Sequence, residues 1–168
     1  LPGLKDARGL SQPPLLWNPS SERPKKQVAR QPQILRVMAM NADVRRLSWI
    51  LYQLKQERVP RTSNLYAHLM LAMRVKGISP ASRMDLYREF RSDDSVTMDV
   101  QSLSTIADHM GVASDLEVIK QVEEDAKRLP SSDLNRLRSC LLSAYSRAGS
   151  ASDCMRYEQQ IIPFFWDM

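Results

Sequence analysis

Residues Leu141 to Gly149 read LLSAYSRAG, and they raise the question of what unit of structure they belong to. Apolar residues lie three and four positions apart, which is the period of one helix face, and a glycine follows where such a helix would end. Nothing in these nine residues resembles a catalytic motif. The stretch therefore predicts a helix followed by a turn, and its function depends on whether the chain repeats it.

The same pattern recurs at a nearly constant spacing. Turns are expected near Ala42, Gly77, Ser114 and Gly149, which are separated by 35, 37 and 35 residues. The segments that lead into them, 31–42, 66–77, 103–114 and 138–149, carry apolar residues at matching positions. The eighth position of each holds Met38, Met73, Met110 or Tyr145. A constant period in this range is typical of a helical repeat, in which stacked neighbours complete one another's core. We expect about eight helices of 11 to 16 residues and no strands.

The composition agrees with a single helical domain that carries a basic arm. The 168 residues include 43% hydrophobic and 26% charged residues and only five glycines. Residues 1–33 hold a net charge of +4, whereas the rest of the chain holds only +1. Six of the ten prolines also lie in residues 2–32, so we expect an extended arm there. Its charge favours a polyanion such as RNA, although a solvated arm without a partner is the alternative.

Several segments resemble the pentatricopeptide repeat. They are LLSAYSRAG, DLYREF at 85–90, MDV at 98–100 and ADVRRLSWILYQLKQERV at 42–59. The resemblance implies an all-α fold, a right-handed solenoid of about four helix-turn-helix units over residues 34–162. It would be preceded by the arm at 1–33 and followed by an apolar tail at 163–168. Tetratricopeptide repeats are the nearest alternative, but this sequence does not fit their characteristic series of Trp, Gly, Tyr and Pro. Other helical repeats remain a further alternative.

The resemblance also implies a function. Members of the family are mostly organellar proteins that bind single-stranded RNA or belong to organellar ribosomes and RNA-processing assemblies. We therefore expect a non-catalytic subunit of a ribonucleoprotein in the mitochondrial matrix. The mitochondrial ribosome is the first choice of particle, and the expected partners are ribosomal RNA and neighbouring proteins. Plastids are the second choice of compartment. The alternatives are a protein-interaction scaffold of an RNA-editing or RNA-processing complex and a small sequence-specific RNA-binding factor.

Two sets of residues are candidates for RNA contact. The first is the set of cations on the arm and in the first unit: Arg23, Lys25, Lys26, Arg30, Arg45, Arg46, Arg58 and Arg61. They could follow a phosphate backbone and displace its counterions. The second set is implied by the family's base-reading positions, which fall on Ala67 with Asp99 and on Ser104 with Leu134, or with Asp133 if the register shifts by one. Pro32 and Ala67 have no side-chain hydrogen-bonding group, so a base code over the array is not expected.

Aromatic residues near both ends are candidates for protein contact. Trp17 is expected to dock on the body or on a neighbour. Pro163 is expected to end the last helix, after which Phe164, Phe165 and Trp166 either fold back as a cap or anchor a partner.

Nothing in the sequence points to an enzyme, a cofactor or a small-molecule substrate. His68 and His109 lack metal-ligand spacing, and we expect them to be ordinary helical residues. Cys140 and Cys154 are expected to be two buried, reduced thiols. No run of about 18 apolar residues is present, so no transmembrane helix is expected. The chain opens on Leu1, so either a targeting peptide has been removed or further residues precede it.

Overall fold

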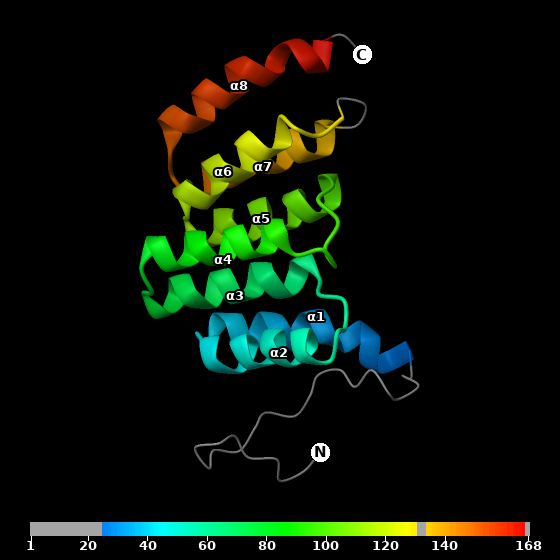
Figure 1. Ribbon diagram of the computed structural model, residues 1–168. Helices are drawn as coiled ribbons and strands as arrows, with labels where there is room; N and C mark the ends of the chain where they lie inside the picture. The colour runs from blue at the N-terminus through cyan, green and yellow to red at the C-terminus, as the bar shows by residue number, and fades with distance from the viewer. Residues whose placement is uncertain (1–24, 131–133, 167–168) are drawn as a thin grey trace.

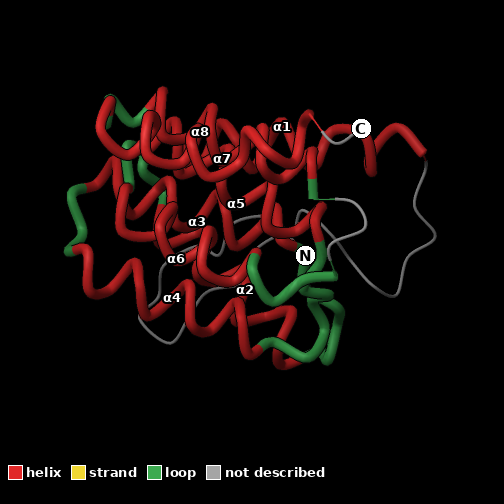
Figure 2. The backbone as a smooth tube through the Cα atoms, turned by 90° about the horizontal axis from the view of Figure 1, so that it is seen from above, coloured by secondary structure: helices red, strands yellow, loops and turns green. Residues whose placement is uncertain are grey.

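A computed structural model describes the backbone of residues 25–130 and 134–166, and within that part the side chains of 33–130 and 134–165. Eight helices and no strand occur in these ranges (Figures 1 and 2). The helices are α1 (Lys25–Met40), α2 (Val44–Gln56), α3 (Ser63–Lys76), α4 (Pro80–Ser92), α5 (Val100–Ala113), α6 (Leu116–Ala126), α7 (Asn135–Arg147) and α8 (Ala151–Trp166). The expected all-α class and the expected helix lengths are confirmed for this part of the chain.

The four expected turns each contain one residue in the left-handed backbone region. These residues are Ala42, Gly77, Ser114 and Gly149, with φ angles of 54°, 81°, 55° and 77°. In each turn the following amide donates to the carbonyl five positions earlier, which belongs to Met38, Met73, Met110 or Tyr145. This is the helix-ending arrangement that satisfies carbonyls left without an amide partner. The repeat seen in the sequence is therefore also a repeat of backbone geometry.

Polar side chains cap the first turns of several helices. Asp43, Thr62, Ser79 and Asp99 each accept a hydrogen bond from a backbone amide in the first turn of α2, α3, α4 and α5, respectively. These bonds satisfy amides that have no partner within the helix. Asp115 precedes α6 but makes no such bond, because its carboxylate binds Arg83 instead.

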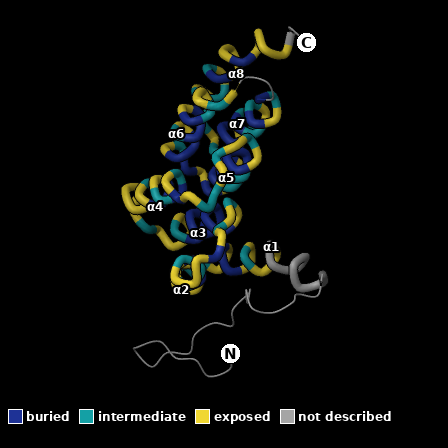
Figure 3. The backbone as a smooth tube through the Cα atoms, turned by 45° about the vertical axis from the view of Figure 1, so that its right-hand side comes forward, coloured by how far each residue is buried: buried dark blue, intermediate teal, exposed yellow. Residues whose placement is uncertain are grey.

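The helix pairs stack in chain order (Figures 1 and 3). The first helices of successive pairs pack side by side, α1 on α3, α3 on α5 and α5 on α7. Helices α5 and α7 approach closely at Gly111, where an added Cβ atom would lie 2.8 Å from the Cα of Ala144. The small side chain of Ala144, in the LLSAYSRAG stretch, thus permits this close helix contact.

The core runs through the stack along the first helices. Residues Leu65 to Ala72 of α3 are all buried because α1, α2, α4 and α5 surround this helix. The largest fully buried side chains include Tyr66, Tyr87, Tyr145 and Phe90. The three buried tyrosine hydroxyls need polar partners inside this core, and buried carboxylates supply them.

Two expectations about prolines are wrong. The backbone of residues 25–33 is helical, so α1 includes Pro32 and begins before the position expected from the arm. Helix α8 also continues through Pro163 to Trp166, so the apolar tail at 163–166 is part of a helix. A proline removes one backbone hydrogen bond, and both Pro163 and Gln159, whose carbonyl loses its partner, are exposed. Water can therefore bind that carbonyl.

Candidate functional site

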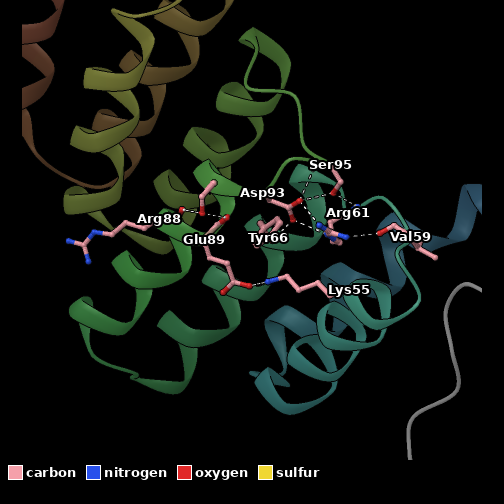
Figure 4. Close-up of polar contacts among 9 residues, drawn as sticks. Lys55, Val59, Arg61, Tyr66, Arg88, Glu89, Asp93 and Ser95 are labelled. Carbon is pink, nitrogen blue, oxygen red and sulfur yellow. Dashed lines mark hydrogen bonds and ion pairs between the residues drawn. The ribbon is translucent and has the colours of Figure 1, made fainter.

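The most elaborate polar cluster surrounds the carboxylate of Asp93, which follows α4 (Figure 4). Arg61 donates to both of its oxygens, from Nε at 2.9 Å and from Nη2 at 2.6 Å. The hydroxyl of Tyr66 donates to Oδ2 at 2.5 Å, and the amide and hydroxyl of Ser95 both donate to Oδ1. The cluster therefore ties the segment before α3 to the segment after α4 within one helix pair.

The surroundings of Asp93 keep it ionised. Its side chain is only 2% exposed. Burial by itself would raise the pKa of this carboxyl, but the hydrogen bonds from Arg61, Tyr66 and Ser95 outweigh burial and hold the pKa well below its usual range. Burial and the bond to Asp93 also raise the pKa of Tyr66, so this hydroxyl stays protonated and donates. The charge on Asp93 is therefore a stable part of the fold.

Two further tyrosines reach buried carboxylates in the same way. Tyr87 of α4 donates to Oδ2 of Asp125 on α6 at 2.5 Å, and Nε of Arg91 lies 3.2 Å from the same oxygen.

Tyr145 of α7 donates to Glu123 on α6, which Arg156 of α8 binds through two nitrogens, each at 2.9 Å. Both clusters join helices of different pairs. When a planar guanidinium donates two hydrogen bonds to one carboxylate, the charges attract each other and the two bonds also fix the relative orientation of the two groups.

A fourth buried ion pair joins α4 to the start of α6. Arg83 donates from Nε to Oδ2 of Asp115 at 2.5 Å and from Nη1 to the carbonyl of Ile78 at 2.5 Å. The side chains of Arg83 and Asp115 are 5% and 3% exposed, respectively. Closer to the surface, Lys55 of α2 forms an ion pair with Glu89 of α4 (Figure 4). Polar contacts therefore hold every pair of neighbouring units together.

These clusters are built to hold helices rather than to act on a substrate. The carboxylates of Asp93, Asp125, Glu123 and Asp115 are buried, and each already accepts from an arginine. A general acid or base needs a proton that it can exchange with a bound molecule, and a buried carboxylate fixed by arginine lacks that access. The chemistry of these sites is structural.

No family model matches this chain, and no curated protein matches it at a significant level. No relative therefore indicates the roles of the candidate functional residues, and the evidence for these roles is the environment of each residue in the fold.

The cations expected to bind RNA fall into different environments. Arg61 is committed to Asp93 and is 16% exposed at its side chain. Arg46 is 54% exposed and pairs with Asp43, its neighbour at the start of the same helix. Arg58 is exposed and has a positive φ of 54° in the turn after α2, and Arg45 takes part in a polar interaction.

The remaining cations of the set are outside the part of the chain whose side chains are described: Arg23, Lys25, Lys26 and Arg30. The backbone of residues 25–30 lies in α1. Among Arg45, Arg46, Arg58 and Arg61, Arg58 is consequently the candidate whose position best suits an external ligand.

Two of the positions implied by the base-reading resemblance are buried, whereas Asp99 is exposed. Ala67 is 0% exposed and Ser104 is 3% exposed. The carboxylate of Asp99 caps α5, and Asp133 lies outside the described residues. Since a base can be read only by a side chain that reaches it, this burial counts against base reading at these two positions.

The aromatic residues proposed for protein contact are partly displayed. Phe164 and Phe165 are 50% and 36% exposed, and the guanidinium of Arg138 lies 3.9 Å above the ring of Phe164. The side chains of Trp17 and Trp166 are outside the described part. At the other end of the stack, Val37 and Met40 of α1 are more than half exposed. Apolar surface is thus present at both ends of the described array.

Three other expectations concern thiols, histidines and the membrane. Cys140 and Cys154 are free and half-buried rather than buried. His68 and His109 pack against each other, a contact between residues 41 positions apart that the sequence pattern does not signal. Within the described ranges, no helix combines the length and apolar character needed to cross a bilayer.

Proposed function

We propose that this protein is a non-catalytic helical-repeat subunit of a mitochondrial ribonucleoprotein, and that the mitochondrial ribosome is the particle that suits it best. In this proposal the four helix pairs form a right-handed solenoid. The observation that carries it is the recurrence of one helix-ending turn at Ala42, Gly77, Ser114 and Gly149. Such arrays act by presenting extended surfaces to partners.

RNA would be bound mainly by the basic N-terminal segment. Residues 1–33 hold six lysines and arginines against two acids, and the remaining 135 residues are almost neutral. The cations would bind phosphates without regard to base, which agrees with the burial of Ala67 and Ser104. Exposed Arg58 would extend this contact onto the first helix pair.

Protein neighbours would cover the two ends of the array. A free solenoid normally has polar end units, whereas this one exposes Val37 and Met40 at one end and Phe164 and Phe165 at the other. Exposed aromatic side chains are favoured at the centres of interfaces. In a large particle, neighbouring proteins would bury the apolar surface at both ends of this subunit.

A second candidate is a protein-interaction scaffold of an RNA-editing or RNA-processing complex that touches no RNA. The ion pair between Arg61 and Asp93 favours this second candidate, because the guanidinium of Arg61 is no longer available to bind a phosphate. A small sequence-specific RNA-binding factor is the weakest candidate, because two of its reading positions are buried.

Crosslinking in a mitochondrial extract separates these candidates. The full chain would be irradiated in the extract, recovered, and mapped for RNA and protein adducts. RNA adducts on residues 1–58, together with protein adducts near both ends, are the expected result. Exclusively protein adducts would favour the scaffold, and copurification with no assembly would contradict both.

A further inference from the structure

Tyr157 of α8 is a fourth largely buried tyrosine, and its surroundings differ from those of the other three. Only 6% of this residue is exposed. The hydroxyls of Tyr66, Tyr87 and Tyr145 each donate to a carboxylate that an arginine also binds. The hydroxyl of Tyr157 has no hydrogen-bond partner among the described residues. Since buried hydroxyl groups are nearly always hydrogen-bonded, Tyr157 is an exception within this core.

Tyr157 lines a groove of about 370 Å³ between α6, α7 and α8, which lie at the C-terminal end of the stack (Figure 1). The apolar side chains along the groove are those of Leu129, Leu134, Leu137, Ile161 and Phe164. In the described ranges, Oγ of Ser104 is the fully buried side-chain oxygen without a partner. The hydroxyl oxygen of Tyr157 also lacks a partner, so it keeps some accessible surface, and the groove provides the access.

Arg138 of α7 lines the same groove and is not paired with an acid. Its guanidinium lies 3.9 Å above the ring of Phe164, and its Nη1 donates to the side-chain oxygen of Asn135 at 3.1 Å. No carboxylate of a described residue binds Arg138, in contrast with the arginines of the three tyrosine clusters. Its charge is close enough to act on Tyr157. The groove thus brings together a tyrosine hydroxyl and an arginine, as in those clusters, but without a carboxylate that binds both.

The other charges around the groove favour an incoming anion at the same place. Burial and the charge of Glu123 raise the pKa of Tyr157, so its hydroxyl keeps the proton and can donate it. Glu123 itself lines the groove, but its carboxylate is already bound by a tyrosine and an arginine. Lys127 also lines the groove and pairs with the exposed Glu124. Arg138 is therefore the cation best placed to receive a further carboxylate.

We propose that this groove binds a protein partner through an aspartate or glutamate side chain that is flanked by large apolar residues. The carboxylate accepts from the hydroxyl of Tyr157 and from the guanidinium of Arg138, which completes the arrangement of the other three clusters. The flanking apolar side chains pack beside Leu137 and Phe164. Phe164 is half exposed, so the groove opens onto the surface where a second polypeptide can reach it.

The proposal rests on the part of the proposed function that places a protein neighbour at this end of the array, and it is independent of RNA. It adds the chemistry by which that neighbour is recognised. The exposed apolar side chains alone would bind any apolar surface, whereas an unpaired arginine beside an unpartnered hydroxyl selects an acidic one.

A peptide array probed with the fluorescently labelled full chain tests this chemistry. The array carries matched pairs of short peptides that differ only in a central Glu or Gln, with two positions on each side drawn from Leu, Phe, Ala and Ser. We expect retention by peptides that combine the central Glu with Leu or Phe neighbours. Their Gln counterparts, and Glu peptides with only Ala and Ser neighbours, should retain much less of the chain.

Variants then assign the binding to the groove, with fluorescence anisotropy of the best Glu peptide as the measurement and circular dichroism as the check of folding. Tyr157→Phe should weaken binding by about tenfold, because it removes one hydrogen bond to a charged group. Arg138→Gln should weaken it by at least about tenfold. Tyr52→Phe and Arg136→Gln are the matched controls, since both residues are exposed and lie outside the groove, and they should leave the affinity unchanged.

Absence of a preference for Glu over Gln, or equal peptide binding by Tyr157→Phe and the wild type, would overturn the proposal. So would a dimer of the full chain in analytical ultracentrifugation that dissociates in Tyr157→Phe, because a second copy would then occupy the groove. RNA binding is a separate readout: Arg138→Gln should bind RNA as the wild type does, so this proposal and the proposed RNA contact can fail independently.

Urea unfolding distinguishes a partner from a carboxylate of this chain. Because the hydroxyl of Tyr157 has no partner among the described residues, Tyr157→Phe should leave the free energy of unfolding unchanged or raise it. Asp133, which lies outside the described residues, is the nearest acid in the sequence to this part of the groove. Similar losses of stability in Tyr157→Phe and Asp133→Asn would place that carboxylate in the groove and overturn the proposal.

Discussion

The hydroxyl of Tyr66 donates a 2.5 Å hydrogen bond to Oδ2 of Asp93, 27 positions later in the chain. The bond closes a helix pair, and equivalent bonds from Tyr87 to Asp125 and from Tyr145 to Glu123 join one pair to the next. The tyrosine ring fills the core while its hydroxyl satisfies a carboxylate that arginine also binds. Polar contacts of this kind give an array of short helices a defined geometry as well as a buried core.

Replacing Asp93 with asparagine should strongly destabilise the protein. The change leaves Arg61 without its buried counter-ion and weakens the bond from Tyr66. We expect the free energy of unfolding to fall by roughly 3 kcal/mol, measured by urea denaturation. Asp94→Asn is the matched control because it removes the same charge at the next, less buried position, and it should change stability by less than about 0.5 kcal/mol. Equal effects of the two changes would contradict the role given to Asp93.

The stabilisation by Asp93 should disappear in acid. Its pKa is lower in the folded protein than the value of about 3.9 for an unfolded chain, so between these pKa values the unfolded state binds more protons. The stabilisation is therefore fully present above the unfolded-state pKa and declines as the pH falls towards the folded-state pKa. The difference in unfolding free energy between wild type and Asp93→Asn should be largest at pH 7 and smaller at pH 3. A difference that does not vary with pH would contradict this.

The four repeated turns predict opposite effects of glycine and alanine. Ala42 and Ser114 adopt positive φ angles that glycine accepts more easily, so Ala42→Gly should raise the unfolding free energy by up to about 1 kcal/mol. Gly149→Ala should lower it by about 1 kcal/mol, and since a Cβ there meets no atom within 4 Å, the cost comes from the backbone alone.

Ala81→Gly in the first turn of α4 is the control for these changes. There glycine should lower the unfolding free energy by about 0.5–1 kcal/mol, because the position is an ordinary helical one. The same sign for Ala42→Gly and Ala81→Gly in thermal or urea unfolding would be evidence against the turn geometry.

Ser104 and Ser102 on α5 predict opposite changes in stability. The hydroxyl of Ser104 is buried and has no hydrogen-bond partner among the described residues, whereas that of Ser102 donates to the carbonyl of Thr97 at 2.6 Å. Ser104→Ala should leave the unfolding free energy unchanged or raise it by up to about 1 kcal/mol, and Ser102→Ala should lower it by about 1 kcal/mol. Ser104→Ala should also leave RNA affinity unchanged. A loss of affinity confined to one base would support base reading after all.

The sequence alone predicts those features of the fold that local periodicity determines. The apolar spacing in LLSAYSRAG and its weaker copies predicts the helices, and the turns at Gly77 and Gly149 lie where the register places them. Ala42 and Ser114 adopt the same turn without glycine, so the position in the repeat matters more than the residue type.

Features that depend on tertiary contacts cannot be predicted in this way. Asp93 belongs to a run of polar residues, and nothing local shows that Arg61 and Tyr66 converge on it. The burial of Ser104 and the contact of His68 with His109 likewise follow from the packing of α3 on α5. The helix continues through Pro163, against expectation, because the cost of a proline depends on whether the carbonyl it leaves unpaired can meet water.

The proposed function has its most direct test in the salt dependence of RNA binding. Fluorescence anisotropy with an unstructured single-stranded RNA, from 50 to 200 mM salt, would compare the wild type with a variant in which Arg23, Lys25, Lys26 and Arg30 are replaced by glutamine. The control variant carries glutamine in place of four cations exposed by half or more, which are Arg88, Lys127, Arg128 and Arg147.

We expect the wild type and the control to bind with a steep salt dependence. The N-terminal variant should bind weakly, with a logarithmic slope reduced by about 0.7 for each phosphate that it no longer neutralises, or up to about 3 in all. Absence of RNA binding by the wild type, or an unchanged slope in the N-terminal variant, would contradict the proposed function.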